Sequence, residues 1–204
     1  MTLEETIKEK AKNLGFDLVR ITKAENLQKD AEFFEHWIQQ GYAGSMDYLK
    51  KDPQKRGDPE KILPGAKSII CLGMNYYQKR TDTPIHIARY ASGRDYHKVI
   101  QKKLKFFCGF LNQINENEKF YIDTGPVFER GFAEKSGMGF IGKNTCVITR
   151  EFGSYIFIAE IFTTQTVYDA LNRPVSLTTP DESETKPTYN EAGLLEKISV
   201  RLRN

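Results

Sequence analysis

The sequence predicts an α/β fold, and three observations lead to this prediction. Amphipathic segments with helical spacing alternate with short apolar runs of strand length over residues 1–164. One of these runs, residues 68–74, is continuously apolar, which is typical of a central strand buried on both faces. The chain has 204 residues, of which 39% are hydrophobic and 28% are charged. A chain of this length and composition forms a globular domain that needs neither disulfides nor a structural metal to hold its core.

The first part of the chain contains two expected helices and one expected strand. Apolar residues recur at helical spacing over 3–14, and an apolar, β-branched run predicts a strand over 16–21. A second helix is expected over 31–38, and Gly41 is placed to end it. Residues 44–65 are polar and irregular, so we expect a long loop with short helical turns. Long loops in compact domains often carry function.

The clearest amphipathic helix follows the central strand, over residues 100–114. Lys98, Lys102 and Lys105 lie on the face opposite its apolar residues. Such a lysine stripe is usually a solvated face, with contact to nucleic acid as the alternative. The net charge of +3, from 30 basic and 27 acidic residues, is too balanced to indicate nucleic-acid binding by itself.

Three strands and one helix are expected after the amphipathic helix. A short apolar strand over 120–123 precedes a helix over 126–136, which has a proline near its start and a glycine after its end. Two further strands, over 145–149 and 154–162, are separated by a short turn at 150–153. This spacing predicts a β-hairpin.

Residues 165–204 differ in composition from the rest of the chain. Residues 165–193 are rich in Pro, Thr, Glu and Asp and have no periodicity, which predicts disorder. Residues 194–204 predict one short closing helix. We therefore expect a folded domain over 1–164, followed by a divergent, largely disordered tail.

Composition excludes several classes of protein. No apolar run approaches the roughly 18 residues that a membrane-spanning helix requires, and residues 1–15 are too charged for a signal peptide. We expect a soluble, cytoplasmic protein without membrane contact. The three cysteines are far apart and lack C-x-x-C spacing, which predicts reduced, buried thiols. The histidines show no ligand spacing either, so we expect no metal site built from protein side chains alone.

A glycine-rich segment over 137–142 matches the pattern G-x-G-x-x-G, and Lys143 follows it as in a phosphate-binding loop. Both motifs place glycine amides after a strand and at the N-terminus of a helix. Here the glycines follow an expected helix and precede an expected strand, and Asn144 stands where a phosphate-binding loop needs Ser or Thr. Dinucleotide or ATP binding is therefore disfavoured, but the bare backbone allows close approach of a flat or bulky ligand.

Asp123 is the main candidate for chemistry, because an acid at the end of an apolar strand can have a raised pKa and donate a proton. The alternative is a capping or turn aspartate. Glu129 and Arg130 are expected to form a structural ion pair. His97 is either a base or cofactor contact, or a capping or packing residue. Arg56 either binds an anion or is a free arginine in the polar loop.

Three stretches of the sequence together resemble one family. They are LPGAKSIICLGMNYY, RYASGRDYHKVIQKKLK and YIDTGPVFERGFAEKSGMGFIGKNTCVITREFGSYIFIAEIFT, in this order within residues 1–164. The chain resembles the cobalamin-dependent epoxyqueuosine reductases, which finish the queuosine modification of tRNA. The resemblance implies a cobalamin-binding α/β domain with a mixed β-sheet flanked by helices, like the corrinoid-binding domain of reductive dehalogenases.

The resemblance also implies a reaction and a set of site residues. The family reduces the epoxide of epoxyqueuosine to the alkene of queuosine, with reduced cobalt on the substrate carbon and an aspartate that protonates the departing oxygen. That aspartate belongs to a D-T/S-G/A motif, which Asp123-Thr124-Gly125 matches, so the resemblance favours the proton donor over the capping role. Lys143 and Asn144 would donate to the corrin amides. The implied corrin-binding residues are Arg56, Asp123, Ile141, Lys143, Asn144, Val147, Thr149 and Ile158.

The sequence departs from the family after residue 164. Family members continue into a ferredoxin-like module whose cysteine runs hold two iron–sulfur clusters, whereas no cysteine follows Cys146 here. No iron–sulfur cluster is expected in this chain. One interpretation is a truncated reductase that acts on tRNA and needs a separate electron-donor protein. The others are a cobalamin-binding module without redox activity and an inactive remnant.

Overall fold

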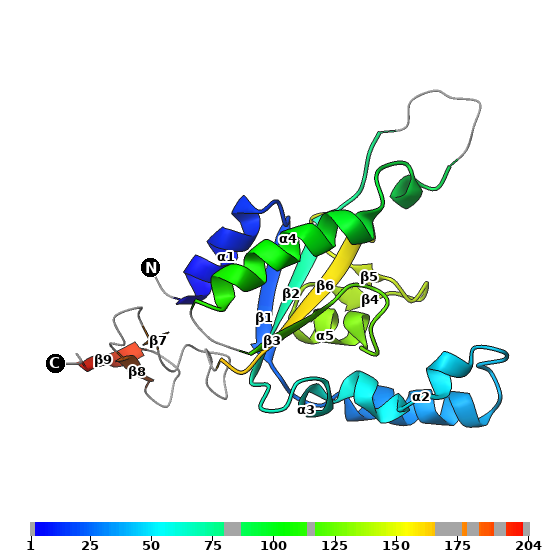
Figure 1. Cartoon of the computed structure of the whole chain (residues 1–204), viewed down its shortest axis with the longest axis horizontal. Helices are drawn as coiled ribbons and strands as arrows, with labels where there is room; N and C mark the ends of the chain where they lie inside the picture. The colour runs from blue at the N-terminus through cyan, green and yellow to red at the C-terminus, as the bar shows by residue number, and fades with distance from the viewer. Residues whose placement is uncertain are drawn as a thin grey trace.

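The computed structural model describes residues 3–79, 87–113 and 117–165, together with the backbone of three strands further along the chain. Its centre is a four-stranded sheet (Figure 1), in the order β1 (Leu18–Lys23), β2 (Ser68–Asn75), β6 (Ile156–Thr163) and β3 (Glu118–Tyr121). Every pair of neighbours in this sheet is antiparallel. The α/β class is confirmed, but the expected mixed sheet is wrong for the described strands. The physical reason is that β6 pairs between β2 and β3, so those two parallel strands are not neighbours.

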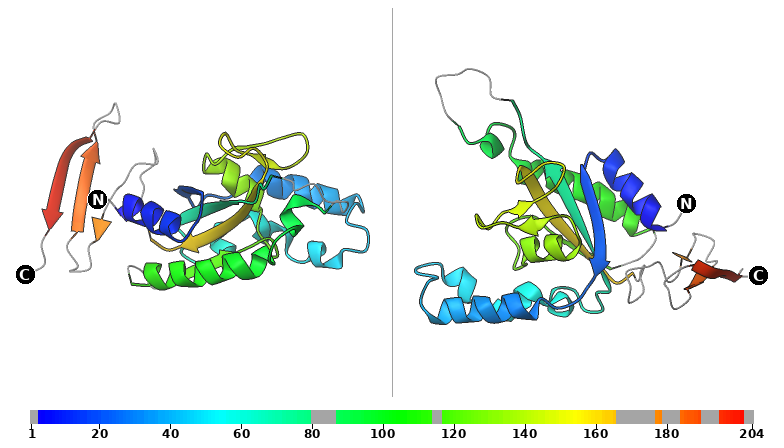
Figure 2. Two further views of the ribbon diagram at one scale, coloured as in Figure 1. Left: turned by 90° about the horizontal axis from the view of Figure 1, so that it is seen from above. Right: turned by 180° about the vertical axis from the view of Figure 1, so that it is seen from behind.

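Helices cover both faces of this sheet (Figure 2). α1 (Leu3–Asn13) and α4 (Tyr96–Leu111) pack on one face, and α5 (Glu129–Lys135) packs on the other. Ile70 and Leu72 of β2 belong to the first apolar core, whereas Ile69 and Cys71 belong to the second. Burial on both faces explains why residues 68–74 are continuously apolar, and it confirms the predicted central strand.

The expected helices over 3–14 and 100–114 are observed as α1 and α4. Gly15 follows α1 with a positive φ of 84°, a backbone conformation that glycine adopts without strain. α4 begins at Tyr96, within the segment 94–97 expected to open it. Asp95 caps the helix, because its side chain accepts a hydrogen bond from the backbone N–H of His97. Residue 114 lies outside the described residues.

The polar loop after the second helix forms short helical turns, as predicted. Figure 1 shows that these turns and α2 (Gln28–Gln39) form an arm beside the sheet. The backbone N–H of Leu27 donates to the carbonyl oxygen of Gly57, which ties the start of α2 to the turns. The turns of the arm are η1 (Asp47–Lys50), η2 (Pro53–Gly57) and α3 (Pro59–Ile62), and a further turn, η3 (Arg89–Ala91), precedes α4.

The segment from α5 to β6 differs from its prediction in two ways. α5 begins at Glu129, three residues after Pro126, so the proline is not in its first turn. A turn does join residues 149 and 153, but the strands on its two sides belong to different sheets. β5 (Val147–Ile148) pairs with β4 (Phe140–Ile141), a strand that the sequence analysis missed, and β6 joins the main sheet. The glycines of 137–142 do follow a helix and precede a strand.

The described part of the tail is a three-stranded antiparallel sheet. Its strands are β7 (Leu177–Thr178), β8 (Glu184–Tyr189) and β9 (Leu195–Arg201). The short helix expected over 194–204 is therefore wrong. The sequence of β9 places Ile198 and Val200 two residues apart, the period of a strand, and pairing with β8 satisfies its backbone. Two of these strands also lie within the stretch for which the sequence predicts disorder. The other tail residues, from 166 on, lie outside the described part.

Candidate functional site

A cleft of about 170 Å³ opens beside the end of β3 and the start of α4. Its walls come from α4, α5, β5, β6 and the connecting loops, including the one that follows β2. The lining combines aromatic and aliphatic side chains with two carboxylates, Asp123 and Glu129. The lining residues are Tyr76, Tyr96, Asp123, Glu129, Arg130, Cys146, Val147, Ser154, Ile156, Phe157 and Ile158.

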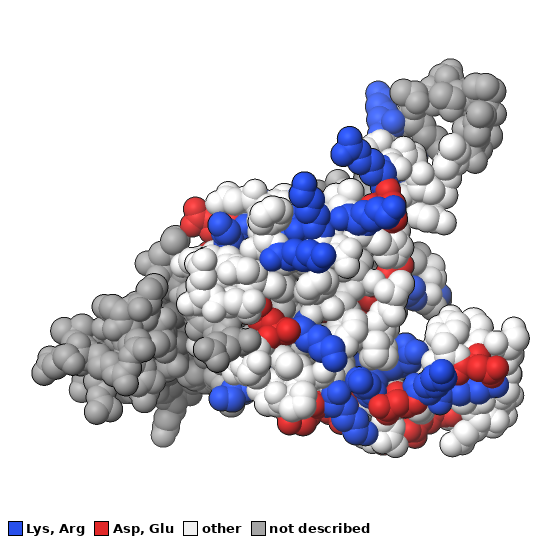
Figure 3. Space-filling model, in the orientation of Figure 1, with Lys and Arg blue, Asp and Glu red and all other residues white. Residues whose placement is uncertain are grey.

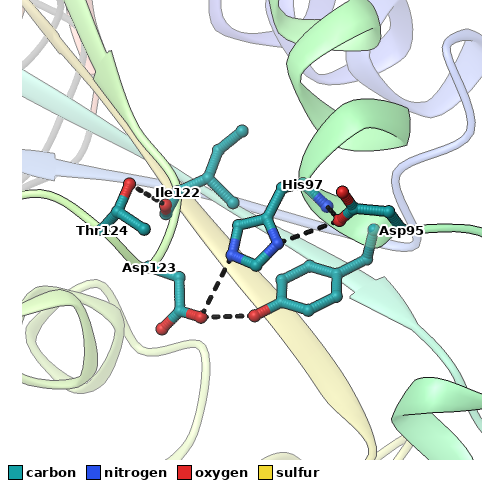
Figure 4. Close-up of polar contacts among 6 residues, drawn as sticks. Asp95, His97, Ile122, Asp123 and Thr124 are labelled. Atoms are coloured by element: carbon teal, nitrogen blue, oxygen red, sulfur yellow. Dashed lines mark hydrogen bonds and ion pairs between the residues drawn. The ribbon is translucent and has the colours of Figure 1, made fainter.

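Asp123 lies in a tight loop that begins two residues after β3. Its φ is +58°, in the left-handed region that few residues other than glycine and asparagine adopt. Thr124 stabilises the turn, because its backbone N–H donates to the carbonyl oxygen of Ile122 at 2.5 Å. Gly125 is required next to it, since a Cβ there would lie 2.1 Å from the Tyr121 ring. The strained turn directs the Asp123 carboxylate toward the first turn of α4 (Figure 4).

Two side chains of α4 hold the Asp123 carboxylate. The Tyr96 hydroxyl donates a hydrogen bond to Oδ2 of Asp123, and His97 Nε2 lies 3.4 Å from the same oxygen. The other ring nitrogen of His97, Nδ1, lies 3.0 Å from Oδ1 of Asp95 (Figure 4). The ring of Tyr96 stacks on Phe157 with a centroid distance of 4.0 Å. Asp95, His97 and Asp123 therefore form one polar chain, and the Asp123 side chain is 58% exposed at its end.

The structure resolves the alternatives for His97 and adds Tyr96, which the sequence analysis missed. His97 takes part in the cap of α4 through its backbone, and its ring contacts Asp123. The sequence did contain a signal that could have identified Tyr96. Asp95 is a good N-cap, and the residues that follow a cap lie at the exposed end of a helix. What the sequence did not show is that this end faces the turn after β3.

Burial and the charge of Asp123 raise the pKa values of its neighbours Tyr96 and Glu129. Burial and the hydrogen bond to Asp123 raise the pKa of Tyr96, so its hydroxyl stays a donor at neutral pH. Burial, followed by the nearby charge of Asp123, raises the pKa of Glu129 to about 7. The expected ion pair of Glu129 with Arg130 is wrong. Arg130 Nη1 instead donates to the carbonyl oxygen of Thr145 at 2.9 Å, and Oε1 of Glu129 is buried without a partner.

Three of the eight expected cofactor residues line this cleft: Asp123, Val147 and Ile158. Thr149 does not, because it is 3% exposed and its hydroxyl closes the turn to Gly153. Ile141 lies on β4, where it and Phe140 are exposed apolar side chains.

The remaining expected residues lie around the cleft. Asn144 accepts a hydrogen bond from the backbone N–H of Cys146 at 3.2 Å, and Lys143 precedes it in the same exposed turn. The Arg56 guanidinium lies over the Phe34 ring, 5.4 Å from its centroid, and burial lowers its pKa. The charge of Arg56 favours the ionised form of Glu129, whereas the charge of Asp123 opposes it.

The cysteines match their expectation in part. All three cysteines are free, and Cys71 is buried whereas Cys108 and Cys146 are half-buried. Within residues 3–165, apart from the two short undescribed gaps, no three His, Cys, Asp or Glu side chains are grouped as a metal site. No helix in the described part of the chain has the length and apolar character to cross a membrane.

The sequence is similar to those of curated epoxyqueuosine reductases. Residues 56–124 match the family model described as epoxyqueuosine reductase QueG, DUF1730. The chain is 42% identical to the epoxyqueuosine reductase of Gloeobacter violaceus over 164 residues, which are 78% of this chain and 51% of that protein. It is 37% identical to the Pseudomonas aeruginosa protein of the same name over 170 residues, 78% of this chain and 47% of that one.

The fold is similar to solved structures of the same enzyme. A crystal structure of epoxyqueuosine reductase with an epoxyqueuosine-modified tRNA-Tyr stem loop gives a TM-score of 0.73 at 32% identity, covering 79% of this chain and 45% of that one. The Bacillus subtilis enzyme, with its catalytic aspartate loop swung out of the active site, gives 0.68 at 30% identity, with the same two coverages. The chain spans about half the length of the curated relatives it matches. It belongs to the epoxyqueuosine reductase family.

Proposed function

We propose that this chain forms the acid-bearing, cobalamin-binding part of a cytoplasmic epoxyqueuosine reductase, which reduces the epoxide of epoxyqueuosine in tRNA to queuosine. The observation that carries the proposal is the Asp123 carboxylate at the cleft wall, held by Tyr96 and His97 of α4. The matched Bacillus subtilis structure is described by its catalytic aspartate loop. The backbone of Asp123 has a positive φ, and strained backbone of this kind is often found at active sites.

The residues around the cleft fit a corrin in chemical character. A corrin is a flat, mostly apolar ring with amide groups at its margin. Val147, Ile156 and Ile158 provide an apolar wall in the cleft, and the exposed Phe140 and Ile141 of β4 extend apolar surface beside it. Exposed Lys143 and Asn144, in the turn after β4, offer donors for the amide groups. Bound cobalamin would supply the reducing centre that attacks the substrate carbon.

The chain's own residues supply the acid chemistry. The protonated Asp123 carboxyl would give its proton to the epoxide oxygen as the carbon–oxygen bond breaks. Tyr96 and His97 act as positioning residues, because both contact the same Oδ2 and fix the direction of the carboxyl group. The stacking of the Tyr96 ring on Phe157 fixes the position of the Tyr96 hydroxyl.

The tRNA substrate and the electron source lie beyond the cleft. Figure 3 shows Lys and Arg side chains gathered over α4, where Lys98, Lys102 and Lys105 are exposed. This basic surface begins at the helix end that holds Asp123, so it is the part of the described surface best suited to tRNA phosphates. Electrons would come from a donor outside residues 1–204, because the three cysteines of these residues are too few for even one four-thiolate cluster.

The shortage of cysteines also favours a second candidate, a cobalamin-binding module that does no redox chemistry, or an inactive remnant of the reductase. An Asp123→Asn variant separates the candidates, with Asp47→Asn, an exposed aspartate of η1, as the matched control. Cobalamin is titrated into each protein and followed by its visible spectrum and by Trp37 fluorescence. Turnover is then measured with epoxyqueuosine-containing tRNA and a chemical or protein reductant.

For the reductase, we expect saturable binding near one to one in all three proteins and turnover lost only in Asp123→Asn. A general acid contributes a factor of roughly 100 to 10,000. Binding without turnover in any protein would favour the cobalamin-binding module. Turnover that survives in Asp123→Asn would refute the acid assignment, and absence of binding would refute the cofactor.

A further inference from the structure

Two further carboxyl groups lie behind Asp123, and the reaction described above leaves them unused. Glu160 of β6 is completely buried, and neither of its carboxyl oxygens has a hydrogen-bond partner among the described residues. Glu129 of α5 lines the cleft beside Asp123, and its Oε1 is likewise buried without a partner. A completely buried polar group without a hydrogen-bond partner is rare, because its desolvation is costly. Such a group in a folded protein therefore calls for an explanation.

The sheet register directs Glu160 toward α5. Glu160 lies opposite Cys71 of β2 and Tyr121 of β3, and residues opposite one another across antiparallel strands share a face. The Cys71 thiol on that face donates to the carbonyl oxygen of Phe132 in α5, at 3.6 Å. Glu160 therefore lies under α5, whose first residue is Glu129. The three acids run from the sheet interior to the cleft in the order Glu160, Glu129, Asp123.

The groups around these two glutamates do not neutralise them. Neither glutamate forms a salt bridge within the described residues, and the titratable groups that share the sheet face of Glu160 are its cross-strand neighbours, the Cys71 thiol and the Tyr121 hydroxyl. Both arginines near Glu129 are engaged elsewhere, Arg130 with Thr145 and Arg56 over the Phe34 ring. The groups that act on Glu129 are Asp123 from the loop after β3, Arg56 from η2, Arg130 from α5, Tyr96 from α4 and Glu160 from β6.

Burial favours the uncharged acid in both residues, although a hydrogen bond from the Asp123 backbone opposes this in Glu129. Burial raises the pKa of Glu129 to about 7, with a further contribution from the charge of Asp123. Burial and then the charge of Glu129 raise the pKa of Glu160 well above its ordinary value. At neutral pH, Glu160 therefore keeps its proton, and Glu129 is close to its midpoint.

We infer that Glu129, backed by the uncharged Glu160, is a proton store that returns a proton to Asp123 after Asp123 has given its own away. This inference rests on the proposed function, in which an epoxide becomes an alkene and water. That change takes two electrons, from the donor protein, and two protons. Asp123 supplies the first proton to the epoxide oxygen. The Glu129 carboxyl then transfers its proton to the Asp123 carboxylate for the second delivery. Glu129, which lines the cleft, takes a new proton from solvent, whereas the buried Glu160 keeps its own.

The test that needs neither cofactor nor turnover is a pH titration of the carboxyl groups by carbon-13 NMR. The protein is labelled at the glutamate and aspartate carboxyl carbons, and Glu129→Gln, Glu160→Gln and Asp123→Asn assign the signals. Glu9→Gln, at an exposed position of α1, is the control. We expect a Glu129 midpoint near pH 7 that falls in Asp123→Asn, and a Glu160 signal that stays protonated at pH 8. Ordinary midpoints, or a Glu129 midpoint that ignores Asp123→Asn, would overturn the inference.

Turnover adds a second readout. With a competent reductant, Glu129→Gln should lower turnover at pH 7 by roughly tenfold, less than the loss of a directly placed acid. Glu9→Gln should leave turnover unchanged. Full turnover in Glu129→Gln would assign the buried pair a structural role only and so overturn the proton store. If the unmodified protein does not turn over, the proposed function fails, and the NMR titration alone decides whether the acids are coupled.

Discussion

Replacing Glu129 with glutamine should change the way stability depends on pH. The pKa of Glu129 is raised from 4.5 to about 7 in the folded protein, so the folded state holds the proton more tightly than the unfolded chain. For an acid of this kind, stability is highest below pH 4.5 and falls as pH rises toward 7, because the unfolded chain ionises first. Above pH 7 the loss is complete and constant.

The size of the effect follows from the two pKa values. A rise from 4.5 to about 7, at about 1.4 kcal/mol per pH unit, amounts to about 3 kcal/mol of lost stability at pH 8. Glutamine has nearly the same shape and carries no charge at any pH. Relative to the unmodified protein, Glu129→Gln should therefore gain about 3 kcal/mol between pH 4 and pH 8.

Urea denaturation at pH 4, 5, 6, 7 and 8, followed by far-ultraviolet circular dichroism, measures this difference. Glu160 contributes to the pH dependence of both proteins. Because the charge of Glu129 raises the pKa of Glu160, its contribution is smaller in Glu129→Gln and acts in the same direction as the expected gain. The Glu9→Gln control should show the same pH dependence as the unmodified protein. A constant difference between Glu129→Gln and the unmodified protein across this range would refute the reasoning, because it would mean that Glu129 titrates alike in both states.

Three further substitutions test other parts of the site. Tyr96→Phe removes the hydroxyl that donates a hydrogen bond to Asp123. A hydrogen bond to a charged group is worth about 1.5 kcal/mol, so turnover should fall roughly tenfold while cobalamin affinity is kept. Unchanged turnover would contradict the positioning role of Tyr96. Gly139→Ala places a Cβ 2.4 Å from the carbonyl oxygen of Ile148. This clash should displace β4 from β5, and we expect the melting temperature to fall by several degrees. Gly109→Ala, in α4 with open space around it, should instead raise stability by up to about 1 kcal/mol, and thermal melts of both glycine variants decide the matter.

Local pattern was enough to predict most of the elements. The continuous apolar run over 68–74 predicted the central strand, since a strand covered on both faces has no polar side. Helical spacing predicted α1 and α4 for a similar reason, because each buries one face against the sheet. The errors lie where long-range pairing overrides local pattern: β6 pairs with β2 and β3 rather than with β5, and β9 pairs with β8 although its sequence suggested a helix.

The sequence by itself determined that Asp123 is a candidate acid, through its place after an apolar strand and through the D-T-G motif. It also determined that the glycine-rich segment is no phosphate loop, because glycines between a helix and a strand cannot offer a helix N-terminus. Only the tertiary structure decided which groups surround Asp123. Tyr96 and His97 reach it from α4, and Glu129 and Glu160 lie behind it on α5 and β6. These residues are far apart in the chain, and packing of the helices on the sheet brings them together. Their protonation follows from that burial, which no local sequence pattern encodes.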